Sequence, residues 1–232
     1  MHDVGSVKDG SYTAAFSDAL VAEAAARPEL VAITAAMPDS CGLLPVAERF
    51  PERVFDVGIA EQHAVTAAAG MAMGGLRPVV ALYSTFLTRA FDQVNLDVGL
   101  HGQPVVFVLD RSGITGDDGP SHHGVLDMVL LSKVPDMTMF APSGHAEIAQ
   151  MLHDALDLCT TGPASIRFPK TMPPDPSDPE LGVAGSGLSA RKIRSGTDIC
   201  LIGVGKMLLA AREAADKLAA EGHDVTLWDP RV

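Results

Sequence analysis

Apolar and polar residues follow two alternating patterns along this chain, one typical of helices and one typical of buried strands. The helical pattern predicts helices over 12–26, 61–73, 144–158 and 207–221. Strand-like apolar runs occupy 30–34, 53–58, 78–83, 104–110, 137–143, 165–169, 198–205 and 223–229. The runs PVVALY and PVVFVLD are almost uniformly apolar, which indicates strands covered on both faces. Strands that alternate with helices predict an α/β fold with a doubly wound parallel sheet.

Composition divides the chain into four segments. We expect a polar lead-in over 1–10, a first α/β domain over 11–170, a linker over 171–196 and a second α/β unit over 197–232. The linker segment is rich in proline, glycine and serine. The second unit holds a single strand–helix–strand pattern, which is too small to form its own core. We therefore expect it to be truncated, or completed elsewhere.

The formal net charge of −12 argues against a nucleic-acid partner, which usually requires a basic face. No apolar run approaches the roughly 20 residues that span a bilayer, and the first residues lack the apolar stretch of a signal peptide. We therefore expect a cytoplasmic protein with no membrane partner. Cys41, Cys159 and Cys200 form no CxxC pattern, so we expect small buried residues rather than metal ligands or disulfides.

Acids, arginines, aromatics and histidines gather between Asp56 and Gly124, at the predicted strand ends where doubly wound sheets bind ligands. Glu61 lies in the apolar frame IAEQHAVTAAAG, where an ionised carboxylate is costly. It either caps the start of a helix, where negative charge is favourable, or holds a proton for exchange. The spacing alone favours neither interpretation.

Tyr83, Phe86 and Arg89 are spaced three residues apart, which keeps them near one helical face. They form either core packing with an exposed arginine, or an aromatic platform for a flat ring with charge near an anion.

The loop GITGDDGPSHHG carries Asp118 and His122, a candidate polar cluster for a substrate hydroxyl or carboxylate. The side chains of His122 and His123 are expected to diverge because they are adjacent, so we predict no metal site there. Arg111 and Arg167 end predicted strands, and a guanidinium group suits a phosphate.

Four segments, FDVGIAEQHAVTAAAGMAMGG, PVVALYSTFLTRAFDQ, LDRSGITGDDGPSHHG and LWDPRV, resemble the 1-deoxy-D-xylulose-5-phosphate synthases, thiamine diphosphate enzymes of the transketolase group. The resemblance runs from about 12 to 231. It implies a pyrimidine-binding domain over 11–170 and the start of a transketolase-type C-terminal domain over 197–232. In that family an N-terminal domain binds the diphosphate through Mg²⁺ at a GDG…N motif. This sequence has no such motif, so we expect the Mg²⁺ ligands on another domain and a fragment or one half of a split enzyme here.

The resemblance also implies roles for individual residues. Glu61 and His122 would be catalytic, with Glu61 hydrogen-bonded to a pyrimidine nitrogen of thiamine diphosphate and Phe86 stacked on that ring. The implied substrate-binding residues are Tyr83, Arg89, Arg111, Asp118, His122 and Arg167. Among these, Tyr83, Arg111 and Arg167 would hold the phosphate of D-glyceraldehyde 3-phosphate, and the others would line the cleft. Where the family has a second arginine after Arg167, this chain has Lys170, which keeps the charge without the fork.

The implied reaction condenses pyruvate with D-glyceraldehyde 3-phosphate and releases CO₂. It is the first step of the non-mevalonate isoprenoid pathway and also feeds thiamine and pyridoxal synthesis. Implied protein partners are a second copy, as in a homodimer, or a complementary diphosphate-binding polypeptide. Two alternatives stay open. One is a beta-type or small subunit of another thiamine diphosphate enzyme, and the other is a catalytically silent dimerisation or regulatory fragment.

Overall fold

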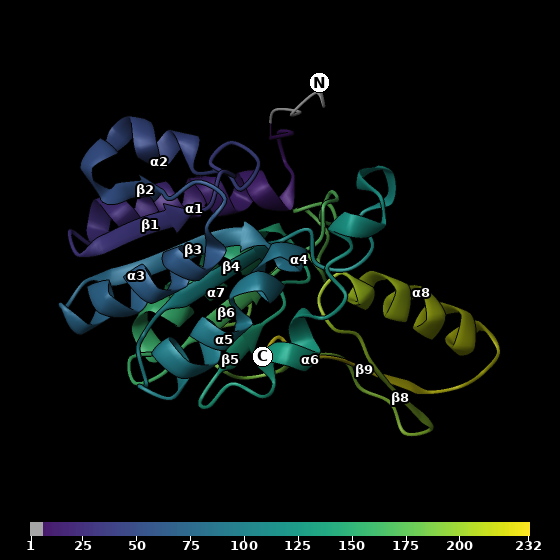
Figure 1. Ribbon diagram of the computed structural model, residues 1–232. Helices are drawn as coiled ribbons and strands as arrows, with labels where there is room; N and C mark the ends of the chain where they lie inside the picture. Colours follow the sequence, from purple (N-terminus) through teal and green to yellow (C-terminus); the bar gives the residue numbers. More distant parts are fainter. Residues whose placement is uncertain (1–6) are drawn as a thin grey trace.

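A six-stranded, fully parallel sheet forms the centre of the first domain, in the order β2-β1-β3-β4-β6-β5. The computed structural model describes residues 7–232 (Figure 1). The strands are β1 (Leu30–Thr34), β2 (Val54–Asp56), β3 (Arg77–Tyr83), β4 (Val106–Asp110), β5 (Thr138–Phe140) and β6 (Ala164–Arg167). The sheet confirms the predicted fold class. Residues 1–6 of the predicted polar lead-in lie outside the described residues.

Helices lie on both faces of this sheet (Figure 1). The longer ones are α1 (Tyr12–Ala26), α3 (Glu61–Met73) and α7 (His145–Leu158), and the shorter ones are α2 (Leu44–Arg49), α4 (Ser84–Leu87), α5 (Phe91–Gln93) and α6 (Asp127–Leu131). A π-helical turn, η3 (Val94–Gly99), follows α5. The hydroxyl of Ser11 caps α1 by accepting a hydrogen bond from the backbone of Ala14 at 3.1 Å. Helix α3 has the bounds that its apolar pattern predicts.

The sheet core is apolar and is tied to α7 by one buried arginine. Every residue of β1 and β4 is buried, as expected for strands covered on both faces. Arg77 begins β3 and donates hydrogen bonds to the carbonyl oxygens of Leu156 and Cys159, at 2.6 and 2.8 Å. These carbonyls lie at the end of α7, where the helix leaves acceptors without internal partners. Arg77 therefore fixes the helix end to the sheet.

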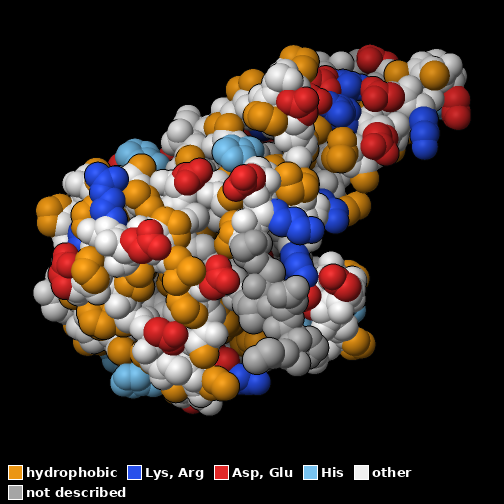
Figure 2. Space-filling model, turned by 90° about the horizontal axis from the view of Figure 1, so that it is seen from above, with side chains coloured by type: hydrophobic (Ala, Val, Ile, Leu, Met, Phe, Trp, Pro, Cys, Tyr) orange, Lys and Arg blue, Asp and Glu red, His pale blue; other side chains and the backbone are white. Residues whose placement is uncertain are grey.

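The second unit is a mixed three-stranded sheet, ordered β7-β9-β8, with one helix. Its elements are β7 (Arg191–Arg194), β8 (Ile199–Ile202), α8 (Met207–Ala220) and β9 (Val225–Asp229). Strand β7 lies within the segment expected to be a linker, and it pairs antiparallel with β9. Figures 1 and 2 show this unit projecting from the body of the first domain. The face in Figure 2 carries acidic and basic side chains interspersed.

A buried ion-pair network joins the two units. Glu147 of α7 is fully buried, and its carboxylate accepts hydrogen bonds from Arg231 at 2.9 Å and from Arg191 at 3.1 Å. It also accepts the backbone N–H of Gly185 at 2.7 Å. Such a network is costly to break by removing one partner, because the others stay buried and charged. The second unit is thus anchored on α7.

Two further sequence expectations concern cysteines and membranes. Cys41 and Cys159 are buried as predicted, whereas Cys200 is exposed, so that part of the prediction was wrong. Cys200 lies in β8, an edge strand whose side chains are alternately half-buried and exposed. No helix within residues 7–232 has the length and apolar character needed to cross a membrane.

Candidate functional site

The carboxyl ends of β3 and β4 bring most of the predicted site residues together. Tyr83, the last residue of β3, is in register with Asp110, the last residue of β4. Helix α4 starts at the next residue after Tyr83, so Phe86 and Arg89 follow within two turns. Tyr83 therefore ends a strand rather than lying in a helix, but the spacing still directs the three side chains to one place.

An aromatic stack with cations on it forms the floor of this site. The rings of Tyr83 and Phe86 are 5.6 Å apart and nearly parallel, at 16°. His122 meets both rings edge-on, at 6.0 and 5.4 Å. The guanidinium of Arg111 lies 4.1 Å from the Tyr83 ring centre, and that of Arg89 lies 4.7 Å from the Phe86 ring centre. These are cation–π distances.

Glu61 is the first residue of α3 and is only 2% exposed. Arg89 donates a hydrogen bond to its carboxylate at 2.8 Å. The start of the helix and this cation thus both lie against the carboxylate. The buried carboxylate lies beside the aromatic stack because Arg89 contacts both Glu61 and Phe86. Its location is compatible with both interpretations left open by the sequence.

Arg111 is held in an unusual conformation next to the stack. Its backbone φ is 59°, in the left-handed region that costs energy for a residue with a side chain. Its guanidinium donates to the carbonyl of Ser40 at 2.8 Å and lies 3.2 Å from the Asp110 carboxylate. Its buried Nε has no hydrogen-bond partner among the described residues and lies 3.8 Å from the carboxylate of Asp118. Among the described residues this buried donor is left unsatisfied, which is uncommon in folded proteins.

Lys170 joins this cluster, a contact that its position after β6 does not reveal. Its ammonium donates to Asp118 at 2.6 Å and lies 3.5 Å from Asp117. The hydrogen bond to Asp118 raises the pKa of Lys170 above its usual value. Lys170 and Arg111 thus flank one carboxylate, so two cations converge at this point.

Arg167 occupies a neighbouring position with a partner of its own. Its Nε donates to the buried carboxylate of Asp127 at 2.8 Å, and the hydroxyl of Ser112 donates to the same oxygen at 2.9 Å. Within the part of the chain that the structure describes, no hydrogen bond or ion pair joins Arg167 to Tyr83 or Arg111. Its phosphate role stays a prediction.

The two adjacent histidines diverge, as their sequence positions suggest. His122 faces the aromatic stack, whereas Nδ1 of His123 lies 2.9 Å from the hydroxyl of Thr115. Among residues 7–232, no group of three histidine, cysteine, aspartate or glutamate side chains is placed to hold a metal ion. The described site residues suit an aromatic ring and an anion.

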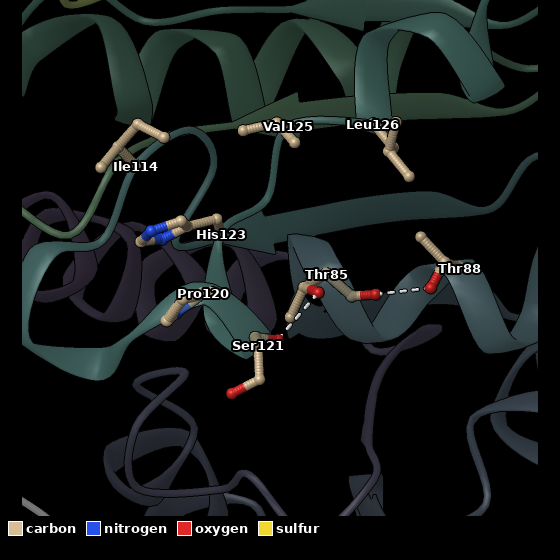
Figure 3. Close-up of a pocket in the computed structure, with 8 residues that line it drawn as sticks. All are labelled: Thr85, Thr88, Ile114, Pro120, Ser121, His123, Val125 and Leu126. Carbon is tan, nitrogen blue, oxygen red and sulfur yellow. Dashed lines mark hydrogen bonds between the residues drawn. The ribbon is translucent and has the colours of Figure 1, made fainter.

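An open pocket of about 460 Å³ adjoins the site, and the sequence did not predict it. It is lined by Thr85, Thr88, Ile114, Pro120, Ser121, His123, Val125 and Leu126. Figure 3 shows Ile114, Val125 and Leu126 across the pocket from Thr85 of α4 and from Thr88, which follows α4. Thr85 donates to the carbonyl of Ser121 at 3.2 Å, which ties the loop to α4.

The doubly wound sheet, with its site residues at the carboxyl ends of β3 and β4, places the protein among the α/β domains that bind ligands at this edge of the sheet. The chain belongs to the transketolase pyrimidine-binding domain family, whose model matches residues 8–175. Residues 188–232 match the transketolase C-terminal domain.

Several similar proteins of known sequence are 1-deoxy-D-xylulose-5-phosphate synthases. A 1-deoxy-D-xylulose-5-phosphate synthase of Mycobacterium avium is 51% identical over 228 residues, covering 95% of this chain and 35% of that protein. One of Thermobifida fusca is 49% identical over 223 residues, with the same coverages. The chain thus spans about a third of the length of these relatives.

Solved structures show the same fold. A structure described as "Split gene transketolase, inactive beta4 tetramer" has a TM-score of 0.83 and 27% identity, covering 97% of this chain and 71% of that one. A transketolase from Leishmania mexicana has a TM-score of 0.81 and 20% identity, covering 98% of this chain and 35% of the other.

Proposed function

We propose that this chain supplies the pyrimidine-binding and phosphate-binding half of a 1-deoxy-D-xylulose-5-phosphate synthase. The enzyme would condense pyruvate with D-glyceraldehyde 3-phosphate and release CO₂. The identity of 47–51% to relatives of that name supports the assignment. The observation that carries it is the buried Glu61 carboxylate beside the Tyr83–Phe86 stack, joined to it through Arg89.

Glu61 and Phe86 would receive the pyrimidine ring of the cofactor. Thiamine diphosphate, when bound, supplies the electron sink for the decarboxylation. Phe86 offers a flat apolar face to the ring. The Glu61 carboxyl would share a proton with a ring nitrogen, and burial keeps water from competing for that proton. Arg89 would hold the carboxyl in place and line the cleft, and His122, edge-on to the stack, would contribute to proton transfer.

Arg111 and Lys170 would bind the phosphate of D-glyceraldehyde 3-phosphate. A phosphate dianion pairs favourably with two cations, and a guanidinium group can pair with its oxygens in a fork. Burial raises the pKa of the Tyr83 phenol, so its hydroxyl stays protonated and able to donate. Asp118, which lies between the two cations, would face the substrate hydroxyl. The family resemblance implies the same role for Arg167, whose guanidinium is paired with Asp127 here.

A complementary diphosphate-binding polypeptide would cover the site. Large apolar side chains that line the pocket of Figure 3 are exposed, including Ile114 at 69%. Val125 and Leu126 are exposed at 55% and 54%. Contiguous apolar surface of this kind commonly marks a protein interface. The relatives are about three times longer, so they have the residues for such a domain. That partner would hold Mg²⁺ and the diphosphate, in a homodimeric or mixed assembly.

A transketolase subunit is the second candidate, because the split-gene transketolase covers this chain at 27% identity. The test mixes this chain with a diphosphate-binding polypeptide, thiamine diphosphate and Mg²⁺, then compares two donors. Release of CO₂ from pyruvate with formation of 1-deoxy-D-xylulose 5-phosphate supports the synthase. Transfer of a two-carbon unit from a ketose phosphate, with no reaction of pyruvate, supports the transketolase instead.

A further inference from the structure

The carboxylate of Asp110 is buried, 1% exposed, and both of its oxygens are engaged. Oδ1 accepts the backbone N–H of Arg111 at 2.6 Å. Oδ2 accepts the hydroxyl of Thr13 at 2.6 Å and lies 3.2 Å from the Arg111 guanidinium. One carboxylate therefore contacts both the main chain and the side chain of Arg111, and α1 fixes it from behind.

The conformation of Arg111 requires such a support. A left-handed backbone at a residue with a long side chain is strained and persists only where its surroundings over-determine it. Here the turn reverses the side chain after β4, so that the guanidinium lies over the Tyr83 ring. Gly124 packs against this turn, and a Cβ there would come within 2.6 Å of the Arg111 carbonyl oxygen.

We propose that Asp110 is a positioning residue for substrate phosphate, one that sets the left-handed turn and the guanidinium of Arg111 while Thr13 orients its carboxylate. The inference rests on the proposed phosphate role of Arg111. Asp110 itself contacts no substrate in this scheme. Its effect passes through Arg111, in the way that outer partners orient the groups that bind a ligand.

An isosteric amide separates positioning from folding. Burial raises the pKa of the Asp110 carboxyl, with Arg111 and Thr13 acting against that rise. Asp110→Asn removes a buried charge and keeps an oxygen for the backbone N–H of Arg111. It places an NH₂ where the guanidinium now meets an acceptor, so two donors face each other. We expect Asp110→Asn to fold while its Arg111 guanidinium leaves its place.

The experiment is NMR spectroscopy of the ¹⁵N-labelled chain, following the Nε–Hε signal of Arg111, which is assigned with Arg111→Lys. Inorganic phosphate and then D-glyceraldehyde 3-phosphate are titrated in. In the wild type we expect a resolved signal that shifts with either ligand. In Asp110→Asn we expect the signal at the position of a mobile arginine, and phosphate affinity lower by roughly ten- to a hundredfold.

Thr13→Val is a milder second variant, for which we expect a smaller loss of phosphate affinity and a smaller change of the Arg111 signal. The matched control is Asp229→Asn, which removes another fully buried carboxylate, one that accepts the backbone N–H of the left-handed Arg231 at 3.1 Å. It should move the Arg231 signal and leave that of Arg111 unchanged. An unmoved Arg111 signal in folded Asp110→Asn, with wild-type phosphate affinity, overturns the proposal.

A wild type that does not bind phosphate overturns the phosphate role of Arg111. In that case the positioning of Arg111 by Asp110 is still decided by the Nε–Hε signal of the variant.

Discussion

Arg89 donates a hydrogen bond of 2.8 Å to the buried carboxylate of Glu61 while its guanidinium lies 4.7 Å from the centre of the Phe86 ring. One side chain thus connects the two residues that would contact the pyrimidine ring. Its own exposure is 48%, against 2% for Glu61. Arg89 thus pairs with a buried charge from the edge of the site. Its removal should lower both the stability of the fold and the activity.

We expect Arg89→Met to lower the free energy of unfolding by about 1 kcal/mol, because Glu61 then keeps a buried carboxylate without its cation. The half-exposed arginine keeps the effect small. Urea denaturation of Arg89→Met, Glu61→Gln and the double variant measures the coupling. Strictly additive losses would show that the pair contributes nothing to the fold.

Lys170→Met should raise the KM for D-glyceraldehyde 3-phosphate roughly tenfold in the reconstituted enzyme, since a charge-assisted hydrogen bond is lost at an exposed position. The KM for pyruvate should not change, and Lys170→Arg should retain most of the affinity. Steady-state kinetics with each substrate varied in turn provide the measurement. The control is Lys133→Met, an exposed lysine with no ion pair among the described residues. Equal changes in both KM values would remove Lys170 from the phosphate site.

Asp178 should make the stability of the second unit fall at acid pH. Its hydrogen bond from Arg212 lowers its pKa to about 2. A carboxyl with a lowered pKa stabilises the folded state above its unfolded pKa of about 4, and the gain disappears as pH falls through about 2. Arg212→Met should therefore be less stable than the wild type between pH 5 and 8, and equal to it near pH 2.

Denaturant titrations at several pH values test this dependence, with Lys217→Met on the same helix as the control. If the difference in the free energy of unfolding between the wild type and Arg212→Met stays constant down to pH 2, Asp178 is not the group that causes the pH dependence.

Glu147→Gln should loosen the second unit from the first, at a cost of about 3 kcal/mol, because Arg231 and Arg191 then stay buried without their carboxylate. Limited proteolysis should show faster cleavage between 171 and 196, and urea unfolding should separate into two steps. Glu213→Gln, on the exposed side of α8, is the control. A single unfolding step at the wild-type midpoint would show that other contacts anchor the unit.

Local pattern predicted the elements well where burial is periodic along the chain. Helix α3 and strand β1 have the predicted bounds because alanine-rich and uniformly apolar runs specify them locally. Strand β7 was missed because its polar sequence, RKIR, becomes a strand only through pairing with β9, 33 or more residues further on. Its arginines are fixed by carboxylates that are distant in sequence.

In the candidate site, too, the sequence predicted where residues lie along the strands but not which distant residues they contact. Sequence order placed Tyr83 and Arg111 at neighbouring strand ends, since parallel strands align their carboxyl ends. It gave no sign that Arg89 pairs with Glu61, that Lys170 reaches Asp118, or that Arg167 faces Asp127. These pairings depend on side-chain directions after folding, which periodicity does not encode. The pocket beside His123 was missed for that reason too.

The role of Glu61 is tested most directly by the initial rate of 1-deoxy-D-xylulose 5-phosphate formation in the complex of this chain with a diphosphate-binding polypeptide. We expect no turnover by this chain alone and measurable turnover by the complex. Glu61→Gln should reduce that rate by at least about a hundredfold, as for loss of a group that moves a proton. Glu52→Gln, an exposed carboxyl, should leave it unchanged. A Glu61→Gln complex that turns over at the wild-type rate would contradict the proposed function of this site.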